Sequence, residues 1–460
     1  MRMKPRLIDK WKDKYDNITN KLYQYPNGVR LLVATNPRTI EFDFSVVVSA
    51  GSYYEKQLGV PQGTAHFLEH MLCSPNNLCK TDRAIEEYTQ GSKSRASFSK
   101  NASTSHKFLY FYAHGHENAA GRMLKFTSAR ILYPLKKFPE YIERERKVII
   151  SEIQRMPKED RDSNLQWDKQ FWGEFAPEFA LRRVGTVDSV NEITVDNLMD
   201  YYHKCFVGSN VAIAVQTSGN LSKEHWGQIN DLAHSILSNK PQLRREIKRF
   251  TPKFKANFFE DPDRSAIFVG INYFYHLQKK LDYRRDRLFV LLRSLISNVG
   301  YDYLRQEKHL VYSVSAFNNI ELFNCKDRGL AIEVDKGKLL EVLDETYHLL
   351  YTKLGEFLDS ASGKKWLNDQ VSSYIFRGND SIDNDYAESL AVDVLDDIME
   401  YKFDYAKSKK EMLKMATRDV KEFINEFLKI EPIFWFNGPH NREEIEEIFK
   451  QSKFYKRFAK

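Results

Sequence analysis

The chain has 460 residues, more than one ordinary hydrophobic core contains, so we expect at least two domains. Basic and acidic residues are nearly balanced, 70 against 63, no nucleic-acid-binding module is recognisable, and four cysteines are too few for a disulfide framework. No stretch has the length and apolarity of a membrane-spanning helix and no secretory signal is visible, which predicts a soluble, cytoplasmic protein that binds neither membrane nor nucleic acid.

The first predicted elements are two β-rich runs, 28–35 and 41–51, separated by an Asn-Pro turn signal. We interpret them as a β-hairpin. A helix is predicted at 64–72, because its apolar residues recur at helical spacing, and the alternation in 97–112 predicts two more strands. The chain therefore begins as a mixture of strands and helices.

Helical periodicity continues at 118–128, 140–154 and 194–203. A β-rich run, 210–217, follows and closes this portion of the chain near residue 220. Strands thus precede and follow the helices, which is typical of an α+β arrangement.

The segment 238–262 is charged and contains proline but has no sustained period, so we interpret it as a linker between domains 1–237 and 263–460. The second half then shows a similar pattern. The strand predicted at 266–275 resembles the earlier strand in 41–51, and the helix predicted at 284–299 resembles the helix at 64–72. We therefore predict an α+β protein of two homologous domains, each a mainly antiparallel sheet with helices packed on it.

The predicted helix 64–72 carries the order His-x-x-Glu-His, as His66, Glu69 and His70, which is typical of inverzincins. Histidines four residues apart lie one turn apart on one helix face, where two imidazoles can chelate a single Zn²⁺. Glu69 projects beside them and is placed to act as a base. A helix with incidental histidines is the alternative interpretation.

A catalytic zinc usually has three protein ligands and an open fourth position, so a third ligand must come from elsewhere. The helical segment 140–154 offers Glu145 and Glu152, which are seven residues apart and so share a face. One of them can bind the metal while the other supports it.

Together these motifs resemble the pitrilysin and insulinase family of zinc metallopeptidases, with a chain size closest to mitochondrial processing peptidase and its bacterial relatives. The resemblance covers nearly the whole length. In that family the third ligand is the second glutamate of such a pair, some eighty residues after the histidines, and Glu152 follows His70 by 82 residues. The resemblance thus implies that Glu152 is the ligand and that Glu145 orients a ligand. Only the first half carries the motif, so we expect one Zn²⁺ per chain.

Two further segments resemble substrate-binding parts of the family. Asn101-Ala-Ser-Thr-Ser is similar to an edge strand whose backbone pairs with an extended peptide, which implies this role for Asn101 and Ala102. Ser103 stands where the family often has tyrosine. Taken alone, the stretch fits an ordinary strand equally well.

In the second half, Arg305 and Tyr312 match an arginine and a tyrosine, seven apart, that grip substrate carbonyls near the zinc. The alternative is an arginine at a helix end and a tyrosine in the core. Gly185 also matches a family segment, and we interpret it as structural.

The predicted function is zinc-dependent endopeptidase or oligopeptidase activity on short or unfolded peptides, with Glu69 as the base and Tyr312 stabilising the oxyanion. The family's peptide chamber has four domains and this chain has two, so the resemblance implies a homodimer with active sites shared between chains; a heterodimer is the other arrangement. The alternative function is a non-catalytic zinc-binding subunit with a structural or chaperone-like role.

Overall fold

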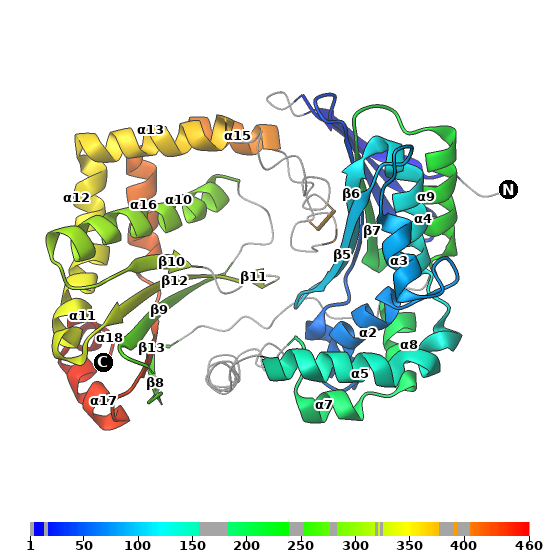
Figure 1. Cartoon of the computed structure of the whole chain (residues 1–460). Coiled ribbons are helices and arrows are strands. Elements are labelled where there is room, and N and C mark those ends of the chain that lie inside the picture. Colours follow the sequence, from blue (N-terminus) through cyan, green and yellow to red (C-terminus); the bar gives the residue numbers. More distant parts are fainter. Residues whose placement is uncertain are drawn as a thin grey trace. The chain divides into compact units, whose positions relative to one another are not determined.

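The protein's structure is a computed structural model, and it divides into two compact units, shown in Figure 1. The first unit comprises residues within Met1–Arg245 and Gly378–Phe403, and the second residues within Glu246–Arg377 and Asp404–Lys460. The residues that the structure describes are 4–12, 17–155, 183–238, 253–262, 264–276, 283–317, 321–322, 325–376, 391–392, 395 and 405–459.

The first unit is built on a seven-stranded sheet with the order β1-β2-β3-β7-β4-β6-β5. Its strands are β1 Arg6–Lys12, β2 Thr19–Gln24, β3 Arg30–Thr35, β4 Glu41–Val48, β5 Phe98–Thr104, β6 Leu109–His116 and β7 Val211–Thr217. All neighbouring strands are antiparallel except β3 and β7, which run parallel. The strands predicted in 97–112 and 210–217 are therefore confirmed as β5, β6 and β7.

The predicted hairpin between 28–35 and 41–51 is wrong, because β7 lies between β3 and β4. Ile213 of β7 is opposite Leu31 on one side and Val46 on the other. Every residue of β7 is buried, as expected for a strand at the centre of a covered sheet. The strand that forms a hairpin with β3 is β2, which precedes it.

Helices lie along one face of this sheet and at one end of it (Figure 1). Along the face run α3, α4 and α9, while α2, α5, α7 and α8 gather at the end. The helical elements are η1 Ser52–Tyr54, α1 Glu55–Leu58, α2 Thr64–Cys73, α3 Asp82–Thr89, η2 Glu117–Ala119, α4 Ala120–Ile131, η3 Leu135–Lys137, α5 Phe138–Arg155, α7 Val187–Glu192, α8 Val195–Cys205, η4 Gly208–Asn210 and α9 Lys223–Ser235. The four helices predicted in this half are confirmed as α2, α4, α5 and α8.

The second unit has its own sheet, with the order β10-β12-β9-β13-β8 and β11 paired to β12. Its strands are β8 Lys255–Glu260, β9 Ile267–His276, β10 Val314–Phe317, β11 Glu321–Leu322, β12 Cys325–Val334 and β13 Ile433–Gly438. Its helical elements are α10 Tyr283–Gly300, the π-helical turn η5 Tyr301–Glu307, η6 Lys336–Lys338, α11 Leu339–His348, the π-helical turn η7 Leu349–Lys353, α12 Leu354–Asp359, α13 Ala361–Phe376, α15 Tyr405–Leu413, α16 Thr417–Phe427, α17 Arg442–Gln451 and α18 Lys453–Phe458.

The two units repeat one topology. In the first unit β3 and β7 are parallel, and β4, β6 and β5 follow antiparallel beyond β7, while β1 and β2 extend the sheet beyond β3. In the second, β8 and β13 are parallel and β9, β12 and β10 follow antiparallel in the same order. The strand β9 thus corresponds to β4, and α10 to the metal-motif helix α2. The predicted α+β fold of two homologous domains is confirmed.

The linker expected at 238–262 stays a prediction. Its residues 239–252 lie outside the described residues, and its last part contains β8, which belongs to the second sheet. Among the residues that the structure describes, no helix combines the length and apolarity needed to cross a bilayer.

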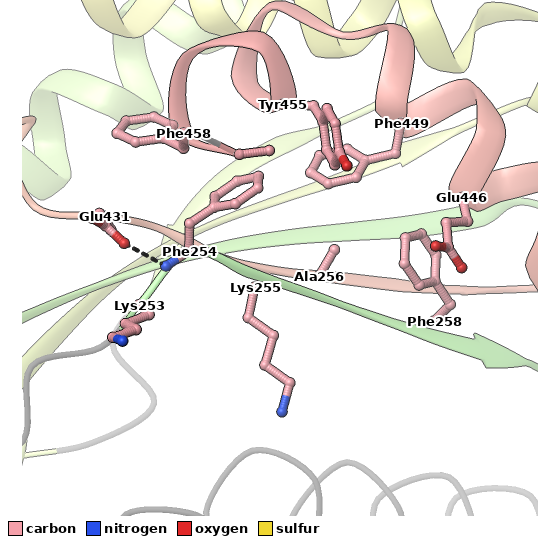
Figure 2. Close-up of a pocket in the computed structure, with 11 residues that line it drawn as sticks. Lys253, Phe254, Lys255, Ala256, Phe258, Glu431, Glu446, Phe449, Tyr455 and Phe458 are labelled. Carbon is pink, nitrogen blue, oxygen red and sulfur yellow. Dashed lines mark hydrogen bonds between the residues drawn. The ribbon is translucent and has the colours of Figure 1, made fainter.

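A cavity of about 580 Å³ lies along β8 in the second unit. Figure 2 shows Phe254 directed toward the aromatic side of the cavity and Lys255 turned away from the rings. Phe254 stacks on Phe449 and Phe458, with ring centroids 5.9 and 5.7 Å apart. The lining contains two carboxylates but no histidine or cysteine, so this cavity is not the predicted zinc site.

Candidate metal centre

The helix that carries the histidine motif, α2, is held at its start by the side chain of a glutamate from another element. Its N-cap residue is Gly63, which has no side chain to satisfy the first N–H groups. Glu55 of α1 replaces that cap, because its two oxygens accept hydrogen bonds from the N–H groups of Gly63, at 3.0 Å, and Ala65, at 2.8 Å. Glu55 is buried, so α2 starts at a fixed point next to His66.

The turn before α2 packs against a second turn through two glycines. Gly63 and Gly185 both have positive φ, of 90° and 78°, a conformation that other residues rarely adopt. A Cβ at Gly63 would lie 2.8 Å from the Val184 carbonyl oxygen, and one at Gly185 would lie 2.7 Å from the Gln62 carbonyl oxygen. This contact gives Gly185 the structural role expected from the sequence.

Three potential metal ligands converge from two helices. His66 and His70 lie one turn apart on α2, and Glu152 projects from α5, which packs against it. Glu152 Oε2 lies 3.8 Å from His66 Nε2 and 3.7 Å from His70 Nε2. One ligand atom from each of the three lies within 4.8 Å of the others, and within the described part of the chain no other group of three or more histidine, cysteine or acidic side chains meets this condition.

The donor set fits a zinc ion. Zinc bonds of about 2.0–2.2 Å to nitrogen and oxygen place tetrahedral ligand atoms about 3.3 Å apart, a few tenths of an ångström closer than the atoms joined here to Glu152. The Glu152 side chain is 44% exposed, so it has room to make that adjustment. Burial lowers the pKa of His66 to about 3, with His70 and Arg183 adding to the effect, so its imidazole is neutral and its lone pair is available to a metal.

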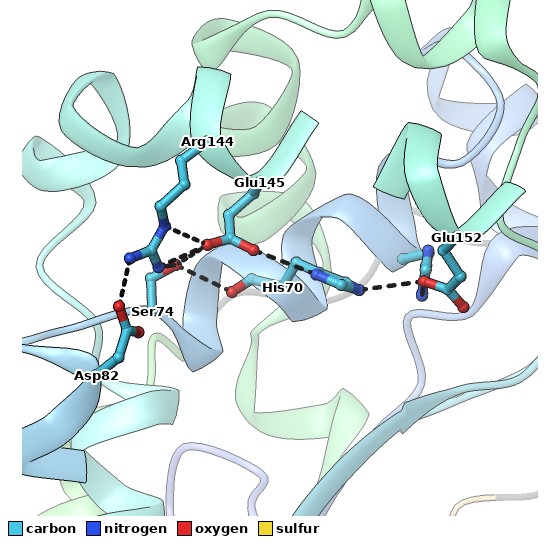
Figure 3. A network of polar contacts seen from close by, with 7 residues as sticks. His70, Ser74, Asp82, Arg144, Glu145 and Glu152 are labelled. Carbon is cyan, nitrogen blue, oxygen red and sulfur yellow. Dashed lines mark hydrogen bonds and ion pairs between the residues drawn. The ribbon is translucent and has the colours of Figure 1, made fainter. Parts of the chain in front are cut away.

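Glu145 orients His70 from the side opposite Glu152, as Figure 3 shows. Its Oε2 lies 3.3 Å from His70 Nδ1, which donates in the tautomer that leaves Nε2 free. Burial alone would raise the pKa of Glu145, but hydrogen bonds from His70 and Arg144 hold it below the ordinary value, so the group is a carboxylate. This is the geometry of a residue that fixes a ligand's orientation.

Glu69 lies between the two histidines in sequence, and its side chain is hydrogen-bonded to a strand of the sheet. Thr104, the last residue of β5, donates a 2.7 Å hydrogen bond from Oγ1 to Glu69 Oε2. Burial raises the pKa of Glu69, and the Thr104 hydrogen bond partly offsets the effect. A carboxylate that is more basic than usual and held in one orientation suits a general base.

Thr104 is a residue that sequence reasoning missed. The sequence pattern predicts a role for the backbone of the stretch from Asn101 and none for the side chain of Thr104. The available signal is the alternation along β5, since Lys100, Ala102 and Thr104 are partly buried while Asn101 and Ser103 are exposed. Thr104 therefore faces α2, not solvent.

The strand β5 is an edge strand of the sheet, as the predicted peptide-binding role of Asn101 and Ala102 requires. The N–H of Ala102 donates to the Asn101 side-chain oxygen, at 2.9 Å. Arg130, buried beneath the strand, donates from Nη1 to the Asn101 carbonyl oxygen at 3.3 Å. The Asn101 carbonyl and the Ala102 N–H belong to one peptide unit and point to opposite sides of the strand, so only one of these two groups can face the open edge.

Arg305 and Tyr312 lie together in the second unit. Arg305 is on the π-helical turn η5, its guanidinium lies 5.0 Å from the centre of the Tyr312 ring, and its Nη1 donates to the Val311 carbonyl oxygen at 3.3 Å. Tyr312 is 76% exposed, so it is not the core tyrosine of the alternative interpretation. The structure brings this pair together but does not relate it to His66, His70 and Glu152, which belong to the first unit.

Comparison with known proteins finds one family in both halves of the chain. The sequence profile described as "Insulinase (Peptidase family M16)" matches residues 30–167, which contain every residue of the candidate metal centre. A second profile, described as "Peptidase M16 inactive domain", matches residues 192–357.

Two relatives and one solved structure illustrate the similarity. The chain is 25% identical over 318 residues to "Uncharacterized zinc protease YmxG" of Bacillus subtilis, an alignment that covers 65% of this chain and 70% of the relative. It is 24% identical over 378 residues to "Probable mitochondrial-processing peptidase subunit beta, mitochondrial" of Arabidopsis thaliana, covering 76% of this chain and 66% of the relative. The crystal structure of the periplasmic protease PqqL from Escherichia coli has the same fold, with a TM-score of 0.73 and 15% identity, over 98% of this chain and 50% of that chain.

Proposed function

Because the chain belongs to the insulinase family of peptidases, we propose that it is a zinc-dependent peptidase that hydrolyses short or unfolded peptides. The observation that carries the proposal is the convergence of His66, His70 and Glu152, with Glu69 beside them. The two imidazoles and the carboxylate offer three ligand atoms and leave a fourth position of a tetrahedral ion open, which is the ligand set of hydrolytic zinc sites.

The assigned roles follow from the chemistry of each side chain. A bound zinc ion would supply Lewis acidity, which polarises a peptide carbonyl and lowers the pKa of a water molecule at the site. Glu69 accepts the proton of the attacking water and passes it to the departing amine, while Thr104 holds its carboxylate in place. Glu145 keeps His70 oriented through Nδ1.

Substrate recognition is assigned to two segments. An extended peptide would add to the edge of β5 at Asn101 and Ala102, a mode that accepts unfolded chains because it requires a free peptide backbone. Arg305 and Tyr312, stacked and accessible in the second unit, would donate to substrate carbonyl oxygens and to the developing oxyanion.

The decisive test replaces Glu69 by glutamine. Glu69→Gln should bind zinc as the wild type does but should lose cleavage of an unstructured peptide pool, followed by mass spectrometry of the products. Glu86→Gln is the matched control, because it removes an exposed carboxylate from the neighbouring helix α3. Undiminished turnover by Glu69→Gln would refute the assigned base.

A separate outcome would favour the alternative function. Stoichiometric zinc bound by the wild type, together with no hydrolysis of any peptide in the pool, would indicate a non-catalytic zinc-binding subunit. Hydrolysis that chelator abolishes and zinc restores is the result expected of the enzyme.

We also propose that the active form contains two chains. This chain spans 50% of the PqqL protease, so a second chain of similar size would supply the equivalent of the remaining half. Both the histidine motif and the Arg305–Tyr312 pair are present in one sequence, which favours a homodimer over a heterodimer. Light scattering of the active fraction should give the mass of two chains, and a mass of one chain would reject this assembly.

A further inference from the structure

Glu145 has two oxygens with different partners, and only one of them faces the candidate metal centre (Figure 3). Oε2 faces His70 Nδ1 at 3.3 Å. Oε1 accepts hydrogen bonds from Arg144 Nε at 2.8 Å, Arg144 Nη2 at 2.6 Å and Ser74 Oγ at 3.2 Å. The orientation of the carboxylate toward His70 therefore depends on groups behind it.

Arg144 is itself held from several sides. Its Nη1 donates to Asp82 Oδ2 at 2.7 Å, and Asp82 is the first residue of α3. Its guanidinium lies 4.9 Å from the centre of the Tyr141 ring, one turn earlier on α5. Its Nη2 also reaches Ser74 Oγ, at 3.4 Å, and Ser74 is the C-cap of α2. The guanidinium thus joins α3, α5 and the end of the helix that carries His66 and His70.

The two ends of this network differ in strength. The Glu145 side chain is 9% exposed and that of Asp82 is 68% exposed, with Arg144 between them at 39%. Ion pairs in water contribute little, whereas a hydrogen-bonded charge pair at a buried carboxylate contributes more and fixes geometry. The contact between Arg144 and Glu145 is therefore the important one, and Asp82 has a minor part.

We propose that Arg144 is a positioning residue of the metal centre, which fixes the Glu145 carboxylate and, through it, the orientation of the His70 imidazole. Ser74 assists with its one hydroxyl proton, for which the same Glu145 oxygen and the His70 carbonyl oxygen, each at 3.2 Å, are alternative acceptors. The inference rests on the proposed zinc site, and it assigns a part of that site that lies beyond the ligands and their immediate support.

The experiment measures zinc affinity of the full chain by competition with a chromophoric chelator. Arg144→Gln should weaken zinc binding about 10- to 100-fold, the range found when the support of a ligand is removed. Asp82→Asn should weaken it less than about fivefold, because that pair is exposed. Arg83→Gln, which breaks an ion pair with Glu87 at an arginine that is 86% exposed, is the matched control and should leave zinc affinity unchanged.

A second measurement separates positioning from general loss of structure. The cobalt-substituted protein should show an altered ligand-field absorption spectrum in Arg144→Gln, while the thermal unfolding midpoint of the metal-free form reports whether the variant folds. Arg144→Lys keeps the charge but lacks the planar fork of donors, so it should restore only part of the zinc affinity. If Arg144→Gln does not fold, the zinc affinity and the cobalt absorption spectrum of Arg144→Lys test the positioning role instead.

The outcomes distinguish the inference from the function on which it rests. A wild-type chain that binds no zinc overturns both. A wild-type chain that binds zinc, with Arg144→Gln or a folded Arg144→Lys that matches its affinity and its cobalt spectrum, overturns the positioning role alone and leaves the proposed peptidase function intact.

Discussion

The two histidines of α2 have unequal surroundings although they lie one turn apart. His70 is oriented by the Glu145 carboxylate at Nδ1. His66 is more deeply buried, and its Nδ1 has no hydrogen-bond partner among the described residues. The position of His66 therefore depends on packing and on the start of α2, while that of His70 depends on a hydrogen-bonded network that single substitutions can remove.

At the residue scale, we expect Thr104 to control the general base. Thr104→Val keeps the shape of the side chain but removes the hydroxyl that donates to Glu69. Turnover should fall roughly 10- to 100-fold, because a hydrogen bond to a charged group contributes about 1.5–3 kcal/mol. Zinc affinity should not change, since Thr104 contacts none of the three ligands.

The control for this prediction is the conservative replacement. Thr104→Ser retains the hydroxyl and should keep most of the turnover, measured as kcat with saturating peptide. Equal turnover in Thr104→Val and the wild type would show that Glu69 needs no partner on β5.

At the scale of the element, the buried cap of α2 makes stability depend on pH. Burial raises the pKa of Glu55 from 4.5 to about 8, and the N–H groups of Ala65 and Gly63 offset only part of the effect. The folded protein therefore retains a proton on Glu55 that the unfolded chain releases above its lower pKa. The stability linked to this proton is fully present below pH 4.5 and is lost as pH rises through about 8.

The corresponding prediction compares the wild type with Glu55→Gln, which imitates the protonated side chain at every pH. The thermal unfolding midpoint of the metal-free wild type should fall more than that of Glu55→Gln between about pH 5 and about pH 8. Differential scanning calorimetry on both forms measures this. The wild type and Glu55→Gln contain the same histidines. Unfolding midpoints that change in parallel with pH would therefore mean that Glu55 contributes nothing to the pH dependence of stability.

Elements with a strong local period were predictable from the sequence, and the order of strands was not. The helices α2 and α5 have apolar faces that repeat at helical spacing, so their extents agree with the predicted segments within two residues at each end. The arrangement of β3 and β4 depends on β7, which follows far along the chain. A local turn signal contains no information about a strand inserted from such a distance.

The same distinction applies to the candidate site. His66, Glu69 and His70 form one local motif, and the separation of Glu152 from them is a family property visible in the sequence. The partners of these residues come from elsewhere: Thr104 is 35 positions from Glu69, and no motif joins them. Contacts of this kind follow from tertiary packing, so a single sequence does not reveal them.

At the scale of the whole molecule, the two units have separate hydrophobic cores and the functional groups are divided between them. The proposed zinc ligands lie in the first unit and the Arg305–Tyr312 pair in the second. Substitutions at the Arg305–Tyr312 pair should therefore leave metal binding unchanged.

Tyr312→Phe tests this division. Loss of the hydroxyl should lower kcat/KM about 100-fold, the effect typical of removing one oxyanion donor, with zinc affinity unchanged. Tyr301→Phe is the matched control, because Tyr301 is also exposed in η5 and accepts a hydrogen bond only from Gln306 within the described contacts. If Tyr312→Phe has the kcat/KM of the wild type, the tyrosine has no part in catalysis.

The insertion of β7 between β3 and β4 has a consequence for biosynthesis. A ribosome completes the codons for His66, His70 and Glu152 before it reaches Val211, so a nascent chain can contain every ligand while its sheet still lacks the central strand. Non-local strand pairing is a slow step in folding, and β4 and β3 are joined only through this late arrival. We therefore expect metal binding at the proposed site to follow translation of β7.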